Sequence, residues 1–279
     1  MEVVTTVQQM TTLARAWDFR PDTALVPTMG YLHDGHLKLV REARAHCERV
    51  IVSIFVNPLQ FGPSEDFGRY PRNFDRDVEM LSSAGVDLVF APLPADMTPP
   101  EMTYQVDPGP AANVLCGRYR PGHFIGVATI VMKLFQVVRA GQAFFGWKDA
   151  QQFLILQKMV RDLNVPMMLT GVETVREPDG LAMSSRNSYL TEKERRAAPV
   201  IYQALRAAGD AWSKGECHAD KLAEMTRDII ASEPAVKLQY VEIVSMDGLE
   251  PVDKVQPGNT LIAVAAHLGS TRLIDNIRL

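Results

Sequence analysis

Two histidines spaced three residues apart are the side chains of this chain best suited to chemistry on a phosphate. They close the segment Pro27-Thr28-Met29-Gly30-Tyr31-Leu32-His33-Asp34-Gly35-His36. On a helical turn, residues three apart face the same side. Imidazole N–H groups placed there can stabilise the charge that builds on a phosphorus undergoing substitution. The alternative is two unrelated surface histidines on a loop and a helix start, and the elements around the pair disfavour it.

Those elements predict a ligand-binding crevice. Residues 24–28 have the pattern of a short buried strand, Gly30 permits a tight turn, and a helix is predicted from about Gly35 to Cys47. Ligands of doubly wound sheets bind at the carboxyl ends of strands. A helix N-terminus in that position offers unpaired N–H groups and a positive dipole end to phosphate. We therefore expect a nucleotide phosphate at this turn.

Strand-like and helical patterns alternate through the first two-thirds of the chain. Residues 50–56 form a continuous β-branched and aromatic run, as expected of a parallel strand covered on both faces. The other strands are predicted at residues 87–90, 143–145 and 167–172, and helices at residues 73–84, 126–138 and 150–163. This order predicts an α/β fold with a doubly wound, Rossmann-like parallel sheet.

The pattern changes after about residue 187. Helices are predicted at residues 191–214 and 218–232, followed by strands at residues 238–244, 259–266 and 272–277. Helices followed by adjacent strands indicate a smaller α+β domain. We predict a Rossmann-like ligand-binding domain at residues 1–176 and a smaller C-terminal α+β lid domain at residues 177–279.

Composition excludes several classes of protein. The 279 residues carry a net charge of −4, which argues against broad electrostatic binding to nucleic acid or an anionic membrane. Cys47, Cys116 and Cys217 form no CxxC pair and no zinc-like spacing. The N-terminus lacks the basic and apolar regions of a signal peptide, and no stretch approaches the roughly 20 apolar residues of a membrane span. A cytoplasmic location is the expectation.

Further motifs follow the histidine segment in a fixed order. They are IFVNPLQF at residues 54–61, YPR at 70–72, RPGHF at 120–124, FGWKDAQQ at 145–152, DGLAMSSRN at 179–187 and LGSTRLIDN at 268–276. The histidine segment resembles the HIGH-type signature of the nucleotidyltransferase superfamily, which includes the class I aminoacyl-tRNA synthetases. The whole series resembles the pantothenate synthetase (pantoate–β-alanine ligase) family, over nearly all of the chain after the first twenty or so residues.

The resemblance implies a set of ATP-binding residues and a catalytic subset. The implied ATP-binding residues are Met29, Gly30, Tyr31, Leu32, His33, Asp34, Gly35, His36, Gly146, Trp147, Lys148, Asp149, Val175, Met183, Ser184, Ser185 and Arg186. Among them, the implied catalytic residues are His36, His33, Lys148, Ser184, Ser185 and Arg186. A lysine at a strand–helix junction can serve as a point charge on phosphate, and two hydroxyls beside a guanidinium suit a departing pyrophosphate.

The resemblance also implies the substrates and their residues. Gln60 and Gln152 would bind (R)-pantoate, with Gln60 also near β-alanine, and Asn57 completes the implied substrate set although it could be structural beside Pro58. The implied reaction forms pantoyl adenylate from pantoate and ATP, and β-alanine then displaces AMP. Mg²⁺ would be held by phosphate oxygens and water. A homodimer without nucleic-acid or membrane partners is expected.

Some positions depart from the family pattern or allow two interpretations. Trp147 and Ala150 stand where the family more often has an acidic or amide residue and an aromatic one, and Arg76 stands where a carboxylate is common. The acidic side chains Asp75, Asp77 and Glu79 are interpreted as the solvated face of a helix rather than as Mg²⁺ ligands. The sequence does not identify which protein side chains, if any, bind Mg²⁺.

Other functions remain open at this point. An adenylyltransferase that keeps the nucleotide in its product shares the histidine motif, and Gln60, Gln152 and the downstream motifs favour the ligase. A nucleotide-binding module without catalysis is disfavoured because His33, His36 and Lys148 are all present. An aminoacyl-tRNA synthetase is disfavoured because no basic anticodon-binding domain is evident.

Overall fold

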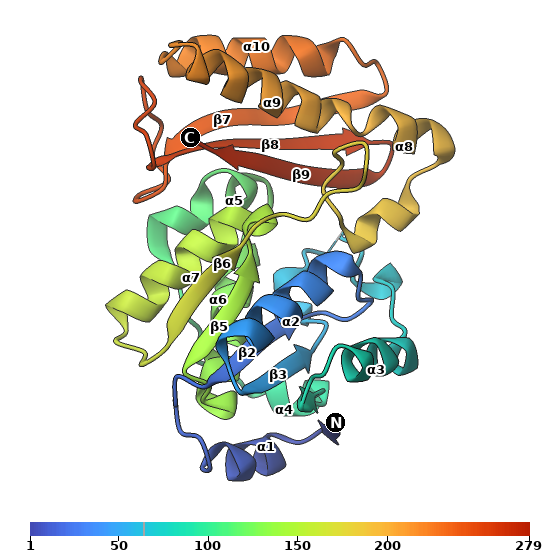
Figure 1. Ribbon diagram of the computed structural model, residues 1–279, viewed down its shortest axis with the longest axis vertical. Coiled ribbons are helices and arrows are strands. Elements are labelled where there is room, and N and C mark those ends of the chain that lie inside the picture. The colour runs from blue at the N-terminus through green and yellow to red at the C-terminus, as the bar shows by residue number, and fades with distance from the viewer. Residues whose placement is uncertain (64) are drawn as a thin grey trace. The chain divides into compact units, whose positions relative to one another are not determined.

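A computed structural model describes residues 1–63 and 65–279, and they form two compact units (Figure 1). The first unit comprises Met1–Asn113, Gly117–Trp147 and Ile155–Glu173. The second comprises Val114–Cys116, Lys148–Leu154 and Thr174–Leu279. Two short segments from the middle of the sequence therefore group with the C-terminal part of the chain.

The first unit is built on a six-stranded parallel sheet in the order β1-β4-β3-β2-β5-β6. The strands are β1 (Glu2–Val4), β2 (Thr23–Thr28), β3 (Arg49–Ile54), β4 (Leu88–Phe90), β5 (Gln142–Gly146) and β6 (Met168–Val172). The central strands are buried on both faces, as their apolar sequences predict. The chain builds outward from β2 through β3 to β4 and then returns to the other side of β2 with β5. This reversal is the switch point at which doubly wound folds bind ligands.

Helices connect these strands. The α-helices up to residue 173 are α1 (Val7–Ala14), α2 (Asp34–His46), α3 (Phe74–Ser83), α4 (Pro94–Met97), α5 (Cys116–Tyr119), α6 (His123–Val138) and α7 (Ala150–Asp162). Short 3-10 helices are η1 (Pro58–Gln60), η2 (Phe67–Arg69), η3 (Gly109–Asn113) and η4 (Trp147–Asp149). Helix α6 is apolar around most of its circumference because it is buried. Along the chain described by the structure, no helix is both long and apolar enough to cross a membrane.

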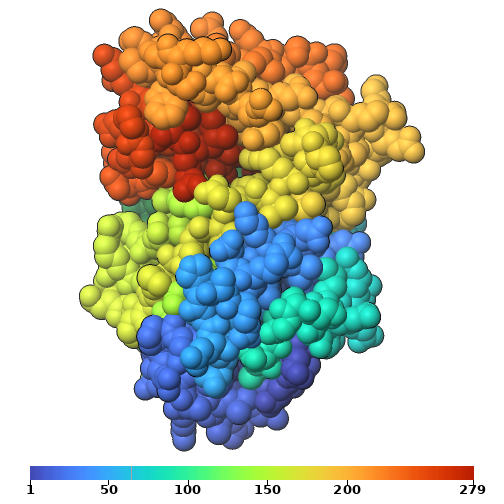
Figure 2. Space-filling model, in the orientation of Figure 1, coloured from blue at the N-terminus to red at the C-terminus, as the bar shows by residue number. Residues whose placement is uncertain are grey.

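The second unit is a three-stranded antiparallel sheet covered by helices. Its elements are η5 (Ser185–Tyr189), α8 (Glu192–Ala197), α9 (Val200–Ser213), α10 (Ala219–Ala231), β7 (Val236–Ser245), β8 (Thr260–Leu268) and β9 (Thr271–Arg278). Helices α9 and α10 lie on one face of this sheet (Figure 1), and their outer side chains form the orange surface in Figure 2. Leu205, Leu222 and Ile262 are wholly buried between these layers.

The predicted doubly wound sheet and smaller α+β region are confirmed, with local differences. The helix predicted at residues 191–214 is two helices, because Pro199 has no N–H to continue the hydrogen-bond ladder. Strand β1 and helix α1 were not predicted from the sequence. Strand β1 has only three residues, and its pairing with the distant β4 makes it a strand.

Candidate active site

The turn after β2 brings the backbone of the histidine segment into a left-handed conformation. Gly30 and Tyr31 have φ angles of 78° and 51°, a region that glycine adopts at no steric cost and other residues adopt rarely. A Cβ on Gly30 would lie 3.0 Å from a carboxylate oxygen of Asp77. The turn therefore needs glycine at this position both for its φ angle and for space.

A buried carboxylate holds this turn in place. The two oxygens of Asp77, on α3, accept hydrogen bonds from the main-chain N–H groups of Tyr31 at 2.7 Å and Leu32 at 2.8 Å. Asp77 is only 1% exposed. Arg76 donates to the Leu32 carbonyl at 3.1 Å. The interpretation of Asp77 as part of a solvated helix face is therefore wrong, whereas Asp75 and Glu79 are not buried.

We expect Asp77→Asn to destabilise the protein and lower its activity. An amide can accept from one of the two N–H groups, but its NH₂ group then faces the other, leaving a buried donor unpaired. The expected cost is about 1.5–3 kcal/mol of unfolding free energy. Urea unfolding and steady-state kinetics measure both effects. Asp75→Asn, an exposed position on the same helix, is the matched control, and equal stability of the two variants would contradict the role of Asp77.

His33 and His36 are paired in a way that sets their tautomers. His33 caps α2 and its Nδ1 accepts from the N–H of Gly35 at 3.1 Å. Nδ1 of His36 accepts from the N–H of His33 at 3.3 Å. The ring centroids are 4.1 Å apart. Because Nδ1 accepts in both rings, the proton of each neutral imidazole is on Nε2, the atom that can donate to a phosphate oxygen.

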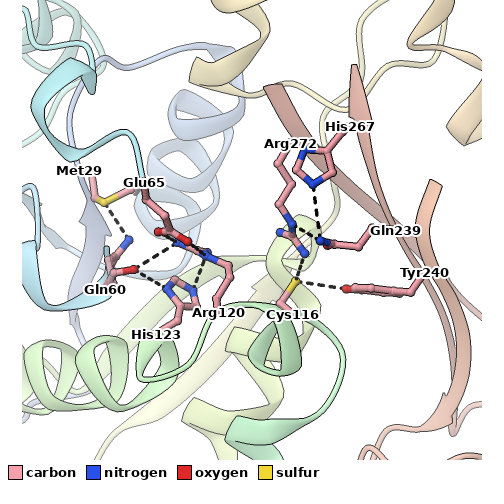
Figure 3. Close-up of polar contacts among 10 residues, drawn as sticks. All are labelled: Met29, Gln60, Glu65, Cys116, Arg120, His123, Gln239, Tyr240, His267 and Arg272. Atoms are coloured by element: carbon pink, nitrogen blue, oxygen red, sulfur yellow. Dashed lines mark hydrogen bonds and ion pairs between the residues drawn. The ribbon is translucent and has the colours of Figure 1, made fainter. Parts of the chain in front are cut away.

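Gln60 lies beside this turn and its side-chain amide is held at both ends. The Oε1 atom accepts from Nδ2 of Asn57 at 3.1 Å. Nε2 donates to Sδ of Met29 at 3.0 Å (Figure 3). Asn57 is buried, donates to the Gly126 carbonyl at 3.1 Å and accepts from the N–H of Leu59 at 3.0 Å. Asn57 thus shapes η1, and the structure brings it together with Gln60 and Met29.

Glu65 and Arg120 form a paired ionic contact near Gln60. Nε and Nη2 of Arg120 each donate to a Glu65 carboxylate oxygen at 2.7 Å. Burial raises the pKa of the Glu65 carboxyl, but the hydrogen bonds and charge of Arg120 outweigh it, so the net pKa lies below its usual value of 4.5. The ionised form is therefore favoured in the folded state.

We expect this pair to make stability depend on pH below neutrality. A lowered pKa gives stabilisation that is fully present above pH 4.5 and is lost as the pH falls through the lowered pKa. Glu65→Gln removes this ionisation, so its unfolding free energy should fall less than that of the wild type between pH 6 and pH 3, a window chosen to bracket about pH 4.5. Urea unfolding at several pH values measures the difference. Parallel curves for the two proteins would exclude the effect.

The second unit carries Lys148, Gln152 and the Ser184–Arg186 motif among the predicted site residues. Lys148 and Asp149 are in η4 and Gln152 is in the first turn of α7, whereas Gly146 and Trp147 belong to the first unit. Nζ of Lys148 donates to Asp149 at 3.3 Å, and the Lys148 carbonyl accepts from Nδ2 of Asn276 on β9 at 3.0 Å. Asn276 therefore anchors the segment that carries Lys148.

Gln151 anchors the same segment from its other end. Its Nε2 donates to the Val114 carbonyl at 2.8 Å, and its Oε1 accepts from the N–H of Cys116 at 3.0 Å. The thiol of Cys116 contacts the Tyr240 hydroxyl at 3.2 Å and accepts from Arg272 at 3.4 Å (Figure 3). These bonds tie residues 114–116 to the C-terminal sheet and explain why so short a segment belongs to the second unit.

The serine–arginine motif follows a hairpin-like loop. The N–H of Met183 donates to the Val175 carbonyl at 2.9 Å, and Ser184 caps η5 by accepting from the N–H of Arg186 at 3.3 Å. Val175, Met183 and the Ser184–Arg186 turn are thus brought together. None of these side chains is fully buried, which leaves them accessible to a ligand.

A buried ion pair anchors the start of this loop. Arg176 donates to both carboxylate oxygens of Asp275 at 2.6 and 2.9 Å, and its guanidinium lies 3.6 Å from the centre of the Tyr202 ring. Burial raises the pKa of the Asp275 carboxyl, and the charge of Arg176 opposes that rise. The sequence motif contains Asp275 and Asn276, but nothing in the sequence identifies Arg176 or the buried Asp77 as anchors.

Metal-ligating side chains do not cluster in the described residues: no group of three His, Cys, Asp or Glu is placed to hold an ion. The carboxylate of Asp77 is already bound to two main-chain N–H groups. The side chains described therefore do not form a protein cage for Mg²⁺.

Comparison with known proteins gives one consistent result. The family described as pantoate-beta-alanine ligase matches residues 2–278. The pantothenate synthetase of Chloroflexus aggregans is 49% identical over 277 residues, covering 99% of each chain. A crystal structure of pantothenate synthetase from Thermus thermophilus is 43% identical with a TM-score of 0.94, covering 100% of this chain and 99% of that one.

A further solved structure is that of a ligand complex. It is the pantoate-beta-alanine ligase from Francisella tularensis, complexed with beta-gamma ATP and beta-alanine. It is 32% identical with a TM-score of 0.81, and covers 100% of this chain and 97% of that one.

Proposed function

Because the chain belongs to the pantoate–β-alanine ligase family, we propose which of its residues carry each half of the ligase reaction. The reaction condenses (R)-pantoate with β-alanine and consumes ATP, giving pantothenate, AMP and pyrophosphate through a pantoyl-adenylate intermediate. The chain is thus an AMP-forming ligase of pantothenate biosynthesis.

In the first half-reaction, a pantoate carboxylate oxygen attacks the α-phosphorus of ATP and the bond to pyrophosphate breaks. We assign the charge stabilisation at that phosphorus to His36 and His33. Both imidazoles carry their proton on Nε2 because Nδ1 accepts from the main chain, and the N-terminus of α2 adds its dipole. His36 is assigned the leading role, and both histidines also take part in capping α2.

The second unit contributes the groups assigned to the other phosphates. Lys148 serves as a point charge on the phosphate oxygens. Ser184, Ser185 and Arg186 receive the departing pyrophosphate, which accepts hydrogen bonds from hydroxyl, guanidinium and loop N–H groups. The rest of the nucleotide contacts are assigned to residues 29–32, 34, 35, 146, 147, 149, 175 and 183. These assignments are supported by the family match and by the anchoring of Lys148 and of the loop described above.

Pantoate is assigned to Gln60 and Gln152, and β-alanine to Gln60. An amide side chain can both donate to a carboxylate and exchange hydrogen bonds with a hydroxyl. Asn57 contributes by holding Gln60, to which it donates directly. In the second half-reaction the amine of β-alanine attacks the acyl carbon of pantoyl adenylate, the bond to AMP breaks, and the amine loses a proton. Positioning and exclusion of water supply the acceleration.

Magnesium is assigned no protein ligand. We propose that Mg²⁺ arrives bound to the phosphates of ATP, where it neutralises their charge. The cation is therefore treated as part of the nucleotide substrate.

We also propose a cytoplasmic homodimer. Tyr104, Met168 and Leu163 on the first unit are 90%, 57% and 54% accessible, and we propose that a second copy of the chain covers them. We expect sedimentation analysis to give twice the mass of one 31.0 kDa chain. A mass of one chain at micromolar concentration would exclude the dimer.

The free thiols Cys47, Cys116 and Cys217 suit a reducing compartment, which supports the proposed cytoplasmic location.

The family match over residues 2–278 carries the proposal, and product analysis tests it. Pantoate alone should release pyrophosphate from ATP and promote ATP–pyrophosphate exchange. Adding β-alanine should then release AMP together with pantothenate. A product that retains the nucleotide would instead indicate an adenylyltransferase. ATP binding without turnover would indicate a binding module.

A further inference from the structure

Three side chains close a hydrogen-bonded set around the main chain of Gln60. Glu65, Arg120 and His123 form this set, which we call the Gln60 bracket (Figure 3). The Gln60 carbonyl accepts from Nδ1 of His123 at 2.8 Å and from Nη2 of Arg120 at 3.2 Å. Nη1 of Arg120 lies 3.0 Å from Nε2 of His123, and Glu65 holds the other edge of the guanidinium.

The donors of Arg120 are mostly engaged within the protein. Nε and Nη2 bond Glu65, Nη2 also bonds the Gln60 carbonyl, and Nη1 bonds His123. The Arg120 side chain is 14% exposed and the Glu65 side chain 24% exposed. An arginine that received a substrate carboxylate would present two parallel N–H groups to it, but Glu65 already occupies that edge. The contacts of Arg120 therefore favour a role in shaping the site over one in binding substrate.

The partners of His123 determine its protonation. Arginine can only donate, so Nε2 of His123 must accept from Arg120. The Gln60 carbonyl can only accept, so Nδ1 of His123 must donate. Both bonds form only in the neutral imidazole with its proton on Nδ1, the opposite tautomer to that of His33 and His36. Protonation of Nε2 would place its N–H against the guanidinium.

The Gln60 bracket adds hydrogen bonds at the end of η1, whose start is capped by Asn57. This helix is only three residues long, and the hydrogen bond from the N–H of Phe61 to the Pro58 carbonyl is 3.3 Å. The side-chain amide of Gln60 relies on Asn57 and on the sulfur of Met29, a weak acceptor. If the Gln60 carbonyl were released, its peptide could rotate and carry the amide with it.

We propose that Arg120 and His123 are positioning residues for pantoate, acting through Gln60. They fix the main chain of Gln60, so that its side-chain amide is oriented before substrate binds. Preorganisation of this kind lowers the entropy that is lost on binding. The proposal rests on the assignment of Gln60 to pantoate, and it adds that residues which contact no substrate determine pantoate affinity.

Steady-state kinetics with a set of variants tests the proposal. His123→Leu removes both hydrogen bonds and should raise KM for pantoate about tenfold, with KM for ATP changed less than about twofold. His123→Asn keeps a donor that can reach the Gln60 carbonyl and should recover most of the loss. Arg120→Gln should raise KM for pantoate in the same way. His218→Leu, the same substitution at an exposed histidine of the second unit, should leave both KM values unchanged.

A double mutant separates action through Gln60 from a merely structural effect. Gln60→Ala should raise KM for pantoate, and adding His123→Leu to it should raise KM no further, because the orientation of a missing amide cannot matter. Independent, multiplying effects would overturn the proposal. Thermal unfolding of each variant shows whether it is folded, and His123→Asn provides the decisive comparison if His123→Leu does not fold.

Nitrogen NMR of the histidine side chains gives a readout independent of activity. His123 in the wild type should carry its proton on Nδ1, and Arg120→Gln should change the Nε2 signal. A protonated Nε2 in the wild type would overturn the proposal.

The kinetic outcomes also distinguish a failure of this proposal from a failure of the assignment of Gln60 to pantoate. If Gln60→Ala leaves KM for pantoate unchanged, that assignment is wrong and the proposal fails with it; if only His123→Leu has no effect, the proposal alone is wrong.

Discussion

Replacing His36 with alanine should lower pantoate-dependent ATP–pyrophosphate exchange by about 100- to 1000-fold, the usual cost of removing one hydrogen-bond donor to developing charge. The imidazole carries its proton on Nε2, because Nδ1 accepts from the N–H of His33. That N–H···N bond is long at 3.3 Å, so its loss should cost little stability. We therefore expect kcat to fall strongly and the unfolding free energy to change little.

Two further variants isolate the Nε2 proton from the helix cap. His36→Asn keeps an acceptor near the position of Nδ1 but has no group at Nε2, so it should be as inactive as His36→Ala and better folded. His46→Ala lies on the same helix in its exposed last turn and should exchange like the wild type. Wild-type exchange in His36→Asn would remove His36 from the chemistry.

Adding one methyl group at Gly126 should destabilise the first unit by about 3 kcal/mol, at the upper end of the usual cost of overpacking. A Cβ there would lie 2.2 Å from the Leu59 carbonyl oxygen and 2.4 Å from its carbon. These are backbone atoms, so neither a rotamer change nor a flexible side chain can relieve the contact. The Gly126 carbonyl also accepts from Asn57, so η1 and Gln60 should shift together.

The measurements for Gly126→Ala are urea unfolding and KM for pantoate, which should both worsen. Gly68→Ala is the matched control, because a Cβ on Gly68 would meet nothing within 4 Å and its φ angle is not in the left-handed region. We expect that control to match the wild type within about 0.5 kcal/mol. If the two alanine variants are equally stable, the close approach of α6 to η1 is not a constraint on the fold.

Local pattern was sufficient to predict the strand, turn and helix that carry the histidine pair. The β-branched run of β3 and the apolar face of α2 were predicted to within a few residues of their observed bounds, because burial on one or both faces imposes a period on the sequence. The tight turn was predicted from Gly30, since the position of a glycine between strand and helix is itself a local signal.

The predictions failed where distant parts of the chain decide the structure. Asp77 resembles its neighbours Asp75 and Glu79 in sequence, yet it alone is buried, because two N–H groups from about 45 residues earlier bind its carboxylate. Arg176 and Asp275 are 99 residues apart and pair at 2.6 Å. No periodicity links such partners, so only the folded structure reveals them.

The chain's own sequence determined its family, its alternation of strands and helices and the identity of the groups proposed to face ATP and pantoate. These depend on residue type, short spacing and strand–turn–helix context, all of which are local. Tertiary structure decided how those groups are held: the carboxylate of Asp77 under the turn, the Nδ1–H tautomer of His123 and the pairing of Asn276 with the Lys148 carbonyl. The physical reason is that a buried polar group must find its partner wherever the fold places one.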